Sequence, residues 1–170
     1  MFRESDTSDL AVRLGERCRI EPPALVGRKY EGWKEALSIG DDAIIRPYSV
    51  IYCDTSIGHH FQCGYFVIVR AECVLADRVT LMSRVTLEGR VHVGAGTKIM
   101  AHVYLPSRTR LGSMVFVGPG TTFLNDRHPI RMPAEQMVVK GAAIEPLWQS
   151  RQVPVMVWAR PSRHWHSRMW

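Results

Sequence analysis

A period of six residues, which begins at Ile39, constrains the fold of this chain more than any other feature. The first residue of every group of six is apolar as far as Phe123. In a chain with 46% hydrophobic residues, a run of fifteen such positions arises by chance in about one of a hundred thousand frames. The positions are Ile39, Ile45, Ile51, Ile57, Cys63, Val69, Leu75, Leu81, Leu87, Val93, Ile99, Leu105, Leu111, Val117 and Phe123.

The fifth residue of each group carries a second signal. Thirteen of the fourteen residues at this position are small or β-branched, and only Phe61 is not. A helix requires a period of 3.6 residues and an ordinary sheet a period of two, so neither explains the pattern. A period of six suits a short strand and a corner, with the first and fifth side chains pointing inward. The sequence therefore predicts an all-β chain that winds as a parallel β-helix.

This pattern resembles the hexapeptide-repeat family, in which an aliphatic residue is followed by Gly or another small or acidic residue, and a small residue stands fifth. The resemblance implies a single-stranded left-handed parallel β-helix with three groups of six per turn. The left hand comes from the resemblance alone, because general rules favour right-handed parallel crossovers. An earlier copy of the repeat, IEPPAL at residues 20–25, is predicted to start the coil. Residues 26–38 then leave it as a loop.

The repeat stops after Phe123. Residues 124–137 are polar and contain two prolines, so they are predicted to form a second loop. MVVKGAAIEP, residues 137–146, matches the repeat again and is predicted to re-enter the coil. We therefore expect a β-helix domain over residues 1–146 and an aberrant, non-repeat tail over residues 147–170.

The tail has a composition unlike the rest of the chain, with four of the five Trp, four Arg and no acidic residue. In relatives, by resemblance, further turns follow the GAAIEP segment and complete the cofactor groove. One hypothesis is that the reading frame slipped near residue 147. The alternative is a divergent cap that covers the open end of the β-helix, whose exposed edge otherwise invites association.

The charge and the cysteines exclude several classes of function. The net charge is +6, but the tail supplies four of these charges, so residues 1–146 carry +2. No cluster of Lys and Arg alternates with aromatic residues there, and we predict no nucleic-acid partner. The N-terminus is polar and no stretch is apolar enough to span a membrane, which predicts a cytoplasmic protein without a membrane partner. The four cysteines form no CxxC pair and are expected to be free thiols.

A second resemblance points to a reaction. VFVGPGTTFLNDRHP, residues 115–129, is similar to a segment of hexapeptide acyltransferases that modify nucleotide-linked amino sugars, and FQCGYFVIVRAE, residues 61–72, is similar to a coil of the same enzymes. This resemblance implies an N-acyltransferase that uses acetyl-CoA as acyl donor and works as a homotrimer. Tyr65 and Ala71 depart from the family, where a His and a nearby acidic residue are common.

Acyl transfer to an amine requires alignment of the amine, removal of its proton and donors for the oxyanion. Asn125 and Asp126 are candidates to hold the amino sugar or receive its proton, and His128 is a candidate base. Asn-Asp before a proline is also ordinary turn chemistry. For the cofactor, Gly118, Pro119, Gly141 and Ala142 match positions at which relatives approach acetyl-CoA. Corner geometry alone is the alternative explanation for these residues.

Position within the repeat places the remaining histidines. His59, His60, His92 and His102 miss both inward positions and are expected to face outward. His102 precedes the Gly118 segment by about one turn, so it is a second candidate base.

Two other functions compete with this hypothesis. The chain could be a catalytically impaired member that serves as a binding or assembly module, because the C-terminal coils are missing. It could also be a zinc hydratase, but that branch of the family needs two histidines five residues apart, and no pair has this spacing. We therefore predict no metal site.

Overall fold

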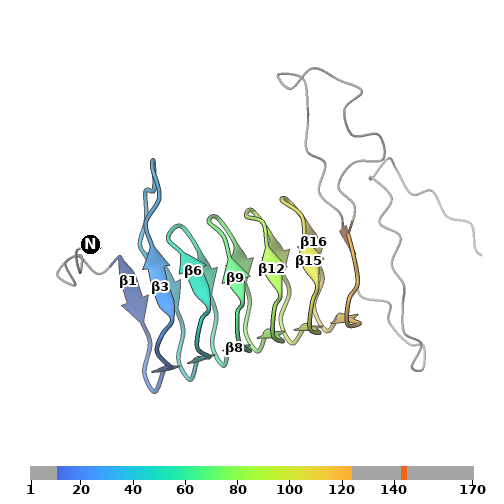
Figure 1. The fold of residues 1–170 in the computed structure, drawn as a ribbon, viewed down its shortest axis with the longest axis horizontal. Helices are drawn as coiled ribbons and strands as arrows, with labels where there is room; N and C mark the ends of the chain where they lie inside the picture. The colour runs from blue at the N-terminus through green and yellow to red at the C-terminus, as the bar shows by residue number, and fades with distance from the viewer. Residues whose placement is uncertain (1–10, 124–142, 145–170) are drawn as a thin grey trace, which may run out of the picture.

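Short parallel strands wind into a long coil in the computed structural model, which describes residues 11–123 and 143–144 (Figure 1). Successive strands belong to three different sheets, and each strand pairs with the strand one turn away. Val74, for example, lies between Ser56 and His92, which are 18 residues before and after it. This register confirms that three groups of six make one turn.

The three flat faces of the coil are named here sheets A, B and C. Sheet A contains β1 (Val12–Leu14), β4 (Leu37–Ile39), β7 (Ser56–Ile57), β10 (Val74–Leu75), β13 (His92–Val93), β16 (Arg110–Leu111) and β18 (Ala143–Ile144). Sheet B contains β2 (Arg19–Ile20), β5 (Ile44–Ile45), β8 (Gln62–Cys63), β11 (Thr80–Leu81), β14 (Lys98–Ile99) and β17 (Phe116–Val117). Sheet C contains β3 (Leu25–Arg28), β6 (Val50–Tyr52), β9 (Ile68–Val69), β12 (Thr86–Leu87) and β15 (Tyr104–Leu105).

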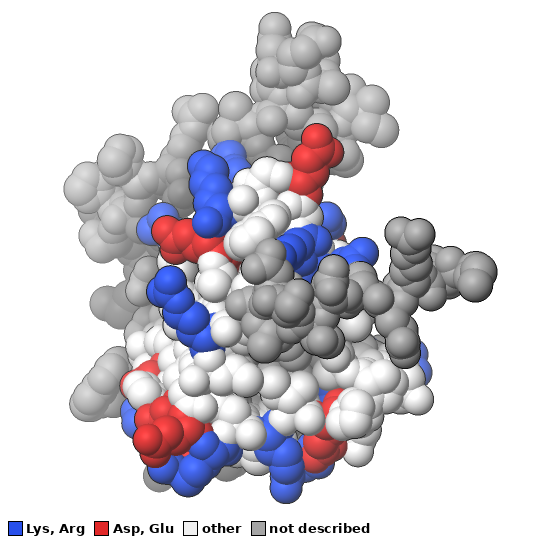
Figure 2. Space-filling model, turned by 90° about the vertical axis from the view of Figure 1, so that its left-hand side faces the viewer, with Lys and Arg blue, Asp and Glu red and all other residues white. Residues whose placement is uncertain are grey.

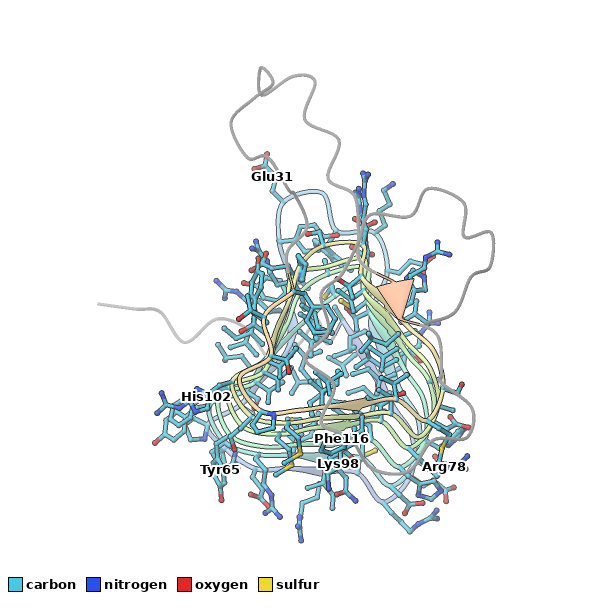
Figure 3. The ribbon with its side chains drawn as sticks, turned by 90° about the vertical axis from the view of Figure 1, so that its right-hand side faces the viewer. Glu31, Tyr65, Arg78, Lys98, His102 and Phe116 are labelled. Carbon is cyan, nitrogen blue, oxygen red and sulfur yellow. The ribbon has the colours of Figure 1, made fainter. Side chains whose placement is uncertain are left out.

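The coil is left-handed, as the family resemblance implies. Figure 3 looks from the C-terminal end and shows Arg78 at the right, Lys98 and Phe116 at the bottom, and Tyr65 and His102 at the left. The chain passes from sheet A through sheet B to sheet C, so it runs clockwise in this view while it rises toward the viewer. A coil with that sense is left-handed.

The interior of the coil is filled by the two positions that the repeat predicts. All fifteen first-position residues are buried, as are twelve of the fourteen fifth-position residues. Val115 and Thr121, near the C-terminal end of the described coil, are partly buried. Phe61, the large exception at the fifth position, has no exposed surface. Burial of one aliphatic side chain stabilises the fold by about 1.5–3 kcal/mol, so these positions supply most of the driving force.

Polar groups inside the coil are paired with the backbone of neighbouring turns. The Ser49 hydroxyl donates to the Gly64 carbonyl at 3.0 Å and accepts from the Val67 N–H at 3.2 Å. Thr97 donates to the Gly112 carbonyl at 2.8 Å and accepts from the Val115 N–H in the same way. Among the described residues, no buried side-chain nitrogen or oxygen lacks a partner. Ser49, Thr55 and Thr97 therefore add hydrogen bonds between turns without a desolvation penalty. Thr109 and Thr121 instead donate to carbonyls three residues earlier in their own turn.

Second-position glycines allow successive turns to approach closely at the corners. A Cβ atom on Gly40 would lie 2.8 Å from the carbonyl carbon of Gly58, and one on Gly64 would lie 2.6 Å from the Ser83 nitrogen. Both distances are shorter than a real carbon contact, so glycine is required at these positions. Gly118 differs, because among the described residues its Cβ would meet only Thr121 Oγ1, at 3.8 Å.

The fourth position of each group adopts the left-handed backbone region, usually without glycine. A residue with a side chain is about 1–2 kcal/mol less favourable there than in the right-handed region. Thirteen such residues have φ between 53° and 65°, namely Arg17, Asp42, Tyr48, Asp54, His60, Phe66, Glu72, Arg78, Arg84, Arg90, His102, Arg108 and Met114. Interior packing thus outweighs a strain that recurs at almost every corner.

The start of the coil differs from the prediction. IEPPAL at residues 20–25 was expected to begin it, but β1 already pairs with β4, with Val12 opposite Leu37. The reason is that AVRLGE, residues 11–16, supplies a buried Ala11 and a backbone that can pair, although Leu14 is exposed. Strand residues extend to Arg28 and resume at Leu37, so the loop between them consists of residues 29–36. Figure 1 shows this loop as the blue projection that follows β3.

The last described strand, β18, lies where re-entry was predicted. It pairs in parallel with β16 and places Ile144 opposite Leu111. The predicted loop over 124–137 and the tail over 147–170 lie outside the described residues, and both remain predictions. Within the part of the chain that the structure describes, no helix is long and apolar enough to cross a membrane.

Candidate functional site

The corner between sheets B and C brings together the candidate residues that the structure describes. It is called the B–C corner here and consists of residues 46–48, 64–66, 82–84, 100–102 and 118–120, which stack on one another at intervals of 18. Two other corners, A–B and C–A, lie at the remaining edges of the triangle (Figure 3).

His102 and the Gly118–Gly120 segment occupy adjacent turns of the B–C corner. The Gly120 N–H donates to the Ala101 carbonyl at 2.9 Å, and the His102 N–H donates to the Ser83 carbonyl at 3.1 Å. The His102 side chain is exposed and points away from the coil (Figure 3). A Cβ atom on Gly120 would meet no described atom within 4 Å. An imidazole therefore lies beside a stretch of backbone that no other described residue covers at Gly120.

Aromatic and cationic side chains continue the same corner toward the N-terminal end. The Tyr48 and Phe66 rings stack with centroids 4.9 Å apart and an interplanar angle of 7°. The Arg84 guanidinium lies 5.5 Å from the Phe66 centroid. These groups are at the fourth position in successive turns, as is His102. The corner thus presents a continuous column of rings and cations that ends in an imidazole.

The remaining candidates lie outside the described residues. They are Asn125, Asp126 and His128, proposed for the amino sugar and the proton, and Gly141 and Ala142, proposed for acetyl-CoA. The structure brings only His102, Gly118 and Pro119 together. Of the two departures from the family, Tyr65 is exposed on the B–C corner, whereas Ala71 lies on the C–A corner.

Comparisons with known proteins support the β-helix fold, although no family model matches the chain. The bifunctional protein GlmU of Bordetella parapertussis is 24% identical over 187 residues, which cover 95% of this chain and 38% of that protein. An acyl-(acyl-carrier-protein)–UDP-N-acetylglucosamine O-acyltransferase of Thiobacillus denitrificans is 26% identical over 116 residues, covering 64% of this chain and 45% of the enzyme.

The crystal structure of LpxA, a UDP-N-acetylglucosamine acyltransferase from Bacteroides fragilis, superposes with a TM-score of 0.63. Its sequence is 22% identical, and the match covers 68% of this chain and 49% of the other. This chain is similar in sequence to hexapeptide-repeat acyltransferases and shares their left-handed β-helix fold. It spans less than half the length of each of these proteins.

Other histidines of this hexapeptide-repeat chain lie away from the B–C corner. His59, His60 and His92 are exposed, as their positions in the repeat predict. His59 Nδ1 accepts from the Asp41 N–H at 3.1 Å, and His60 Nδ1 lies 3.5 Å from an Asp42 carboxylate oxygen. Arg17 binds Asp42 with two hydrogen bonds at 2.6 and 2.8 Å and lowers the pKa of this carboxyl group. Both histidines on the A–B corner thus belong to a surface charge network.

The described residues form no candidate metal site, and three of their four thiols, those of Cys53, Cys63 and Cys73, are buried. The described part of the chain contains no group of three or more His, Cys, Asp and Glu side chains that could hold a metal ion. All four cysteines are free thiols. Burial raises the pKa of Cys63 and raises that of Cys73 to about 11. A thiol that stays protonated inside the core is a poor nucleophile.

Sequence reasoning missed the C–A corner, formed by residues 52–54, 70–72, 88–90 and 106–108. The Asp54 carboxylate there holds the 29–36 loop, because it accepts from the Tyr30 hydroxyl and from the Lys34 and Glu35 N–H groups. Burial opposes ionisation of Asp54, but these hydrogen bonds outweigh it and lower its pKa. The same contact raises the pKa of Tyr30 to about 12. The interruption of the six-residue repeat before residue 37 was the sequence signal that could have pointed to a loop at this corner.

Proposed function

We propose that the chain catalyses transfer of an acetyl group from acetyl-CoA to the amine of a nucleotide-linked amino sugar. The single observation that carries this proposal is the juxtaposition of exposed His102 with the backbone of Gly118–Gly120 on one corner, where a Cβ atom on either glycine would meet no described backbone within 4 Å. The relatives support it, because two of them are described as acyltransferases of UDP-N-acetylglucosamine. The acetyl donor and the amine acceptor come from the resemblance of residues 115–129.

The proposed chemistry assigns one task to each part of the B–C corner. The glycine segment lets the thin thioester arm lie against the backbone, where N–H groups can stabilise the developing oxyanion. The acceptor amine attacks the thioester carbonyl, His102 accepts the proton that the amine loses, and the thiolate of coenzyme A leaves. Asn125, Asp126 and His128 are proposed to position the sugar or share the proton. Gly141 and Ala142 are proposed to extend the surface for acetyl-CoA.

We further propose that the active form is a homotrimer that associates through sheet C. The sixth position of the repeat points outward on each sheet, and on sheet C it carries no charge in any described turn, whereas sheet A has Arg110 and sheet B has Lys98 there. The charged residue exposed on a strand of sheet C is Arg28, at the end of β3. The sixth-position residues of sheet C are Leu25, Val50, Ile68, Thr86, Tyr104 and Thr122. Leu25 is 57% exposed, and Tyr48, Tyr65 and Phe66 extend the apolar surface onto the B–C corner. Apolar patches of a few hundred Å² on a protein surface commonly mark association sites.

Titration with acetyl-CoA tests the proposed function directly. The folded chain should give a heat of binding and a thermal shift, and should release free coenzyme A when a UDP-linked amino sugar is added. If a folded, associated chain shows neither binding nor a shift, the acyltransferase proposal is wrong. An assembly module without a cofactor groove would then explain the fold. The cytoplasmic location expected from the sequence stays a prediction.

A matched pair of variants tests the trimer. Ile68→Glu places a charge on sheet C, and Val74→Glu places the same charge at the equivalent position on sheet A, where Val74 is also exposed. Light scattering after size-exclusion chromatography should show a trimer for the wild type and for Val74→Glu, and a monomer for Ile68→Glu. Equal behaviour of the two variants would contradict the assignment of sheet C.

A further inference from the structure

The N-terminal end of the coil leaves part of its apolar interior uncovered. Among the described residues, β1, β2 and β3 each pair with a strand on one side only, because they are the first strands of the three sheets. The inward positions of this first turn face buried residues of the second turn, as Ile20 faces Ile45. Their own side chains are at most partly buried. These six residues, called the end ring here, are Val12, Leu14, Cys18, Ile20, Ala24 and Val26.

The second turn shows what a covering layer does for the same positions. Leu37, Ile45 and Ile51 lie opposite members of the end ring and have no exposed surface. In the end ring itself, Leu14 is 49% exposed. A strand edge with free backbone groups beside apolar side chains is a template for association. A segment laid over the end ring would remove both the free edge and the exposed apolar surface.

The charges around the end ring are mainly positive. Residues 11–28 contain four Arg and two Glu, which give a net side-chain charge of +2. Two of these arginines are paired with carboxylates, whereas the Arg13 and Arg28 side chains make no hydrogen bond or ion pair within the part of the chain that the structure describes. Figure 2 looks at this end and shows charged side chains around its periphery. A segment that fits is therefore apolar toward the ring and acidic toward the rim.

The two arginines without partners lie near the point where residues 1–10 join the coil. Gly27 lies against Ala11, since a Cβ atom on Gly27 would be 3.3 Å from the Ala11 carbonyl oxygen. Arg28 follows Gly27 directly, and Arg13 follows Ala11 by two residues. An acidic segment that leads into Ala11 thus passes beside both cations.

Residues 1–10 have the composition that this end requires. MFRESDTSDL carries one Arg against Glu4, Asp6 and Asp9, a net side-chain charge of −2. Its aromatic residue, Phe2, precedes Ala11 by nine residues, which corresponds to a reach of up to about 30 Å. One side of the coil spans six residues, or at most about 20 Å. Phe2 can therefore reach any part of the end ring.

We propose that residues 1–10 fold back across the end ring, with Phe2 on its apolar side chains and the three acidic residues beside Arg13 and Arg28. A second copy of the chain fits this end less well, because two first turns that each carry +2 would face one another. The segment closes the coil and prevents end-to-end association of coils. This inference depends neither on acetyl transfer nor on sheet C.

Alkylation of Cys18 in the full chain tests the proposal, because this partly buried free thiol belongs to the end ring. Iodoacetamide should modify Cys18 at least about tenfold faster in Phe2→Asp than in the wild type, since burial of a Phe side chain changes an equilibrium constant by at least that factor. Ser8→Asp adds the same charge to the same segment and keeps Phe2, so Cys18 should react as in the wild type. Buried Cys63 and Cys73 are internal references in mass spectrometry. Equal Cys18 rates in Phe2→Asp and the wild type would refute the proposal.

Two further measurements examine the charge contact and the alternative occupant. Arg13→Gln together with Arg28→Gln should raise the Cys18 rate a few-fold at low salt, and the difference should disappear at about 1 M salt, where charges are screened. Arg78→Gln changes an exposed arginine further along the coil and should leave the rate unchanged. A double variant that reacts as the wild type at low salt would refute the charge contact. A wild-type rate that rises on dilution from about 100 µM to about 1 µM would overturn the proposal in favour of a second copy on the end ring.

Discussion

The B–C and C–A corners are built from the same three positions of the repeat but carry different chemistry. The B–C corner presents rings, Arg84 and His102, with stacked Tyr48 and Phe66. The C–A corner presents paired charges, Arg70 with Glu88 and Glu72 with Arg90. Figure 2, seen from the N-terminal end, shows acidic and basic surfaces next to one another around the periphery. The comparison teaches that the buried first and fifth positions, with glycine at the second position where turns approach closely, fix the coil, while the third and fourth positions can carry different side chains.

The largest expected effect concerns the B–C corner. His102→Ala should lower kcat/KM by about 100-fold or more, because loss of a general base has an effect of that size. His92→Ala removes an exposed imidazole from sheet A and should leave the rate unchanged. Steady-state release of coenzyme A measures both. A rate within about threefold of the wild type for His102→Ala would transfer the role of base to His128 or Asp126.

The next effect concerns the attachment of the loop at the C–A corner. Asp54→Asn removes a carboxylate that accepts three hydrogen bonds, and should lower the free energy of unfolding by about 1–2 kcal/mol. Cys53, which has no exposed surface beneath this region, should then react faster with a thiol reagent. Cys63 and Cys73, which are buried in the core, serve as internal references in mass spectrometry. Asp77→Asn is the matched control, because Asp77 accepts one backbone bond on the A–B corner.

The stability that the Tyr30–Asp54 hydrogen bond contributes depends on pH. The pKa of Asp54 is lowered, so its contribution is present above the ordinary carboxyl pKa of about 4 and is lost as the pH falls below it. The pKa of Tyr30 is raised to about 12, so its contribution is complete below about pH 10 and is lost between the two values. An ultraviolet titration of the wild type minus Tyr30→Phe should show one tyrosine that ionises near pH 12. A difference curve centred near pH 10 would contradict the contact.

The smallest effect concerns the backbone strain at the fourth position of the repeat, which recurs at all three corners. Arg78→Gly should raise the free energy of unfolding by about 0.5–1 kcal/mol, because glycine adopts φ 57° without a side-chain penalty but gains entropy in the unfolded chain. Arg78→Ala keeps the strain and removes the side chain, so it separates the two causes. Thermal melts of both variants measure the difference. Equal melting temperatures for the two variants would show that the strain is smaller than we expect.

Particular residues show how much could be predicted from the sequence. The six-residue period identified the core residues, including the unusually large Phe61, because an inward position is defined by spacing alone. It also placed His102 one turn from Gly118. It could not reveal that Ala11 and Val12 already belong to the coil, since a single turn offers no repetition. Nor could it show that Asp54 holds the loop, because that contact joins residues 24 apart through a segment without a pattern. Asn125, Asp126 and His128 lie beyond the described coil and remain predictions.

The register of 18 residues has a consequence for the length of the molecule. Each turn offers its neighbours the same backbone groups, with Leu75 opposite both Ile57 and Val93. Removal or duplication of 18 consecutive residues therefore leaves every remaining strand with a partner in the correct alignment. The number of turns can therefore change without a change in core packing, and the protein can lengthen or shorten by whole turns.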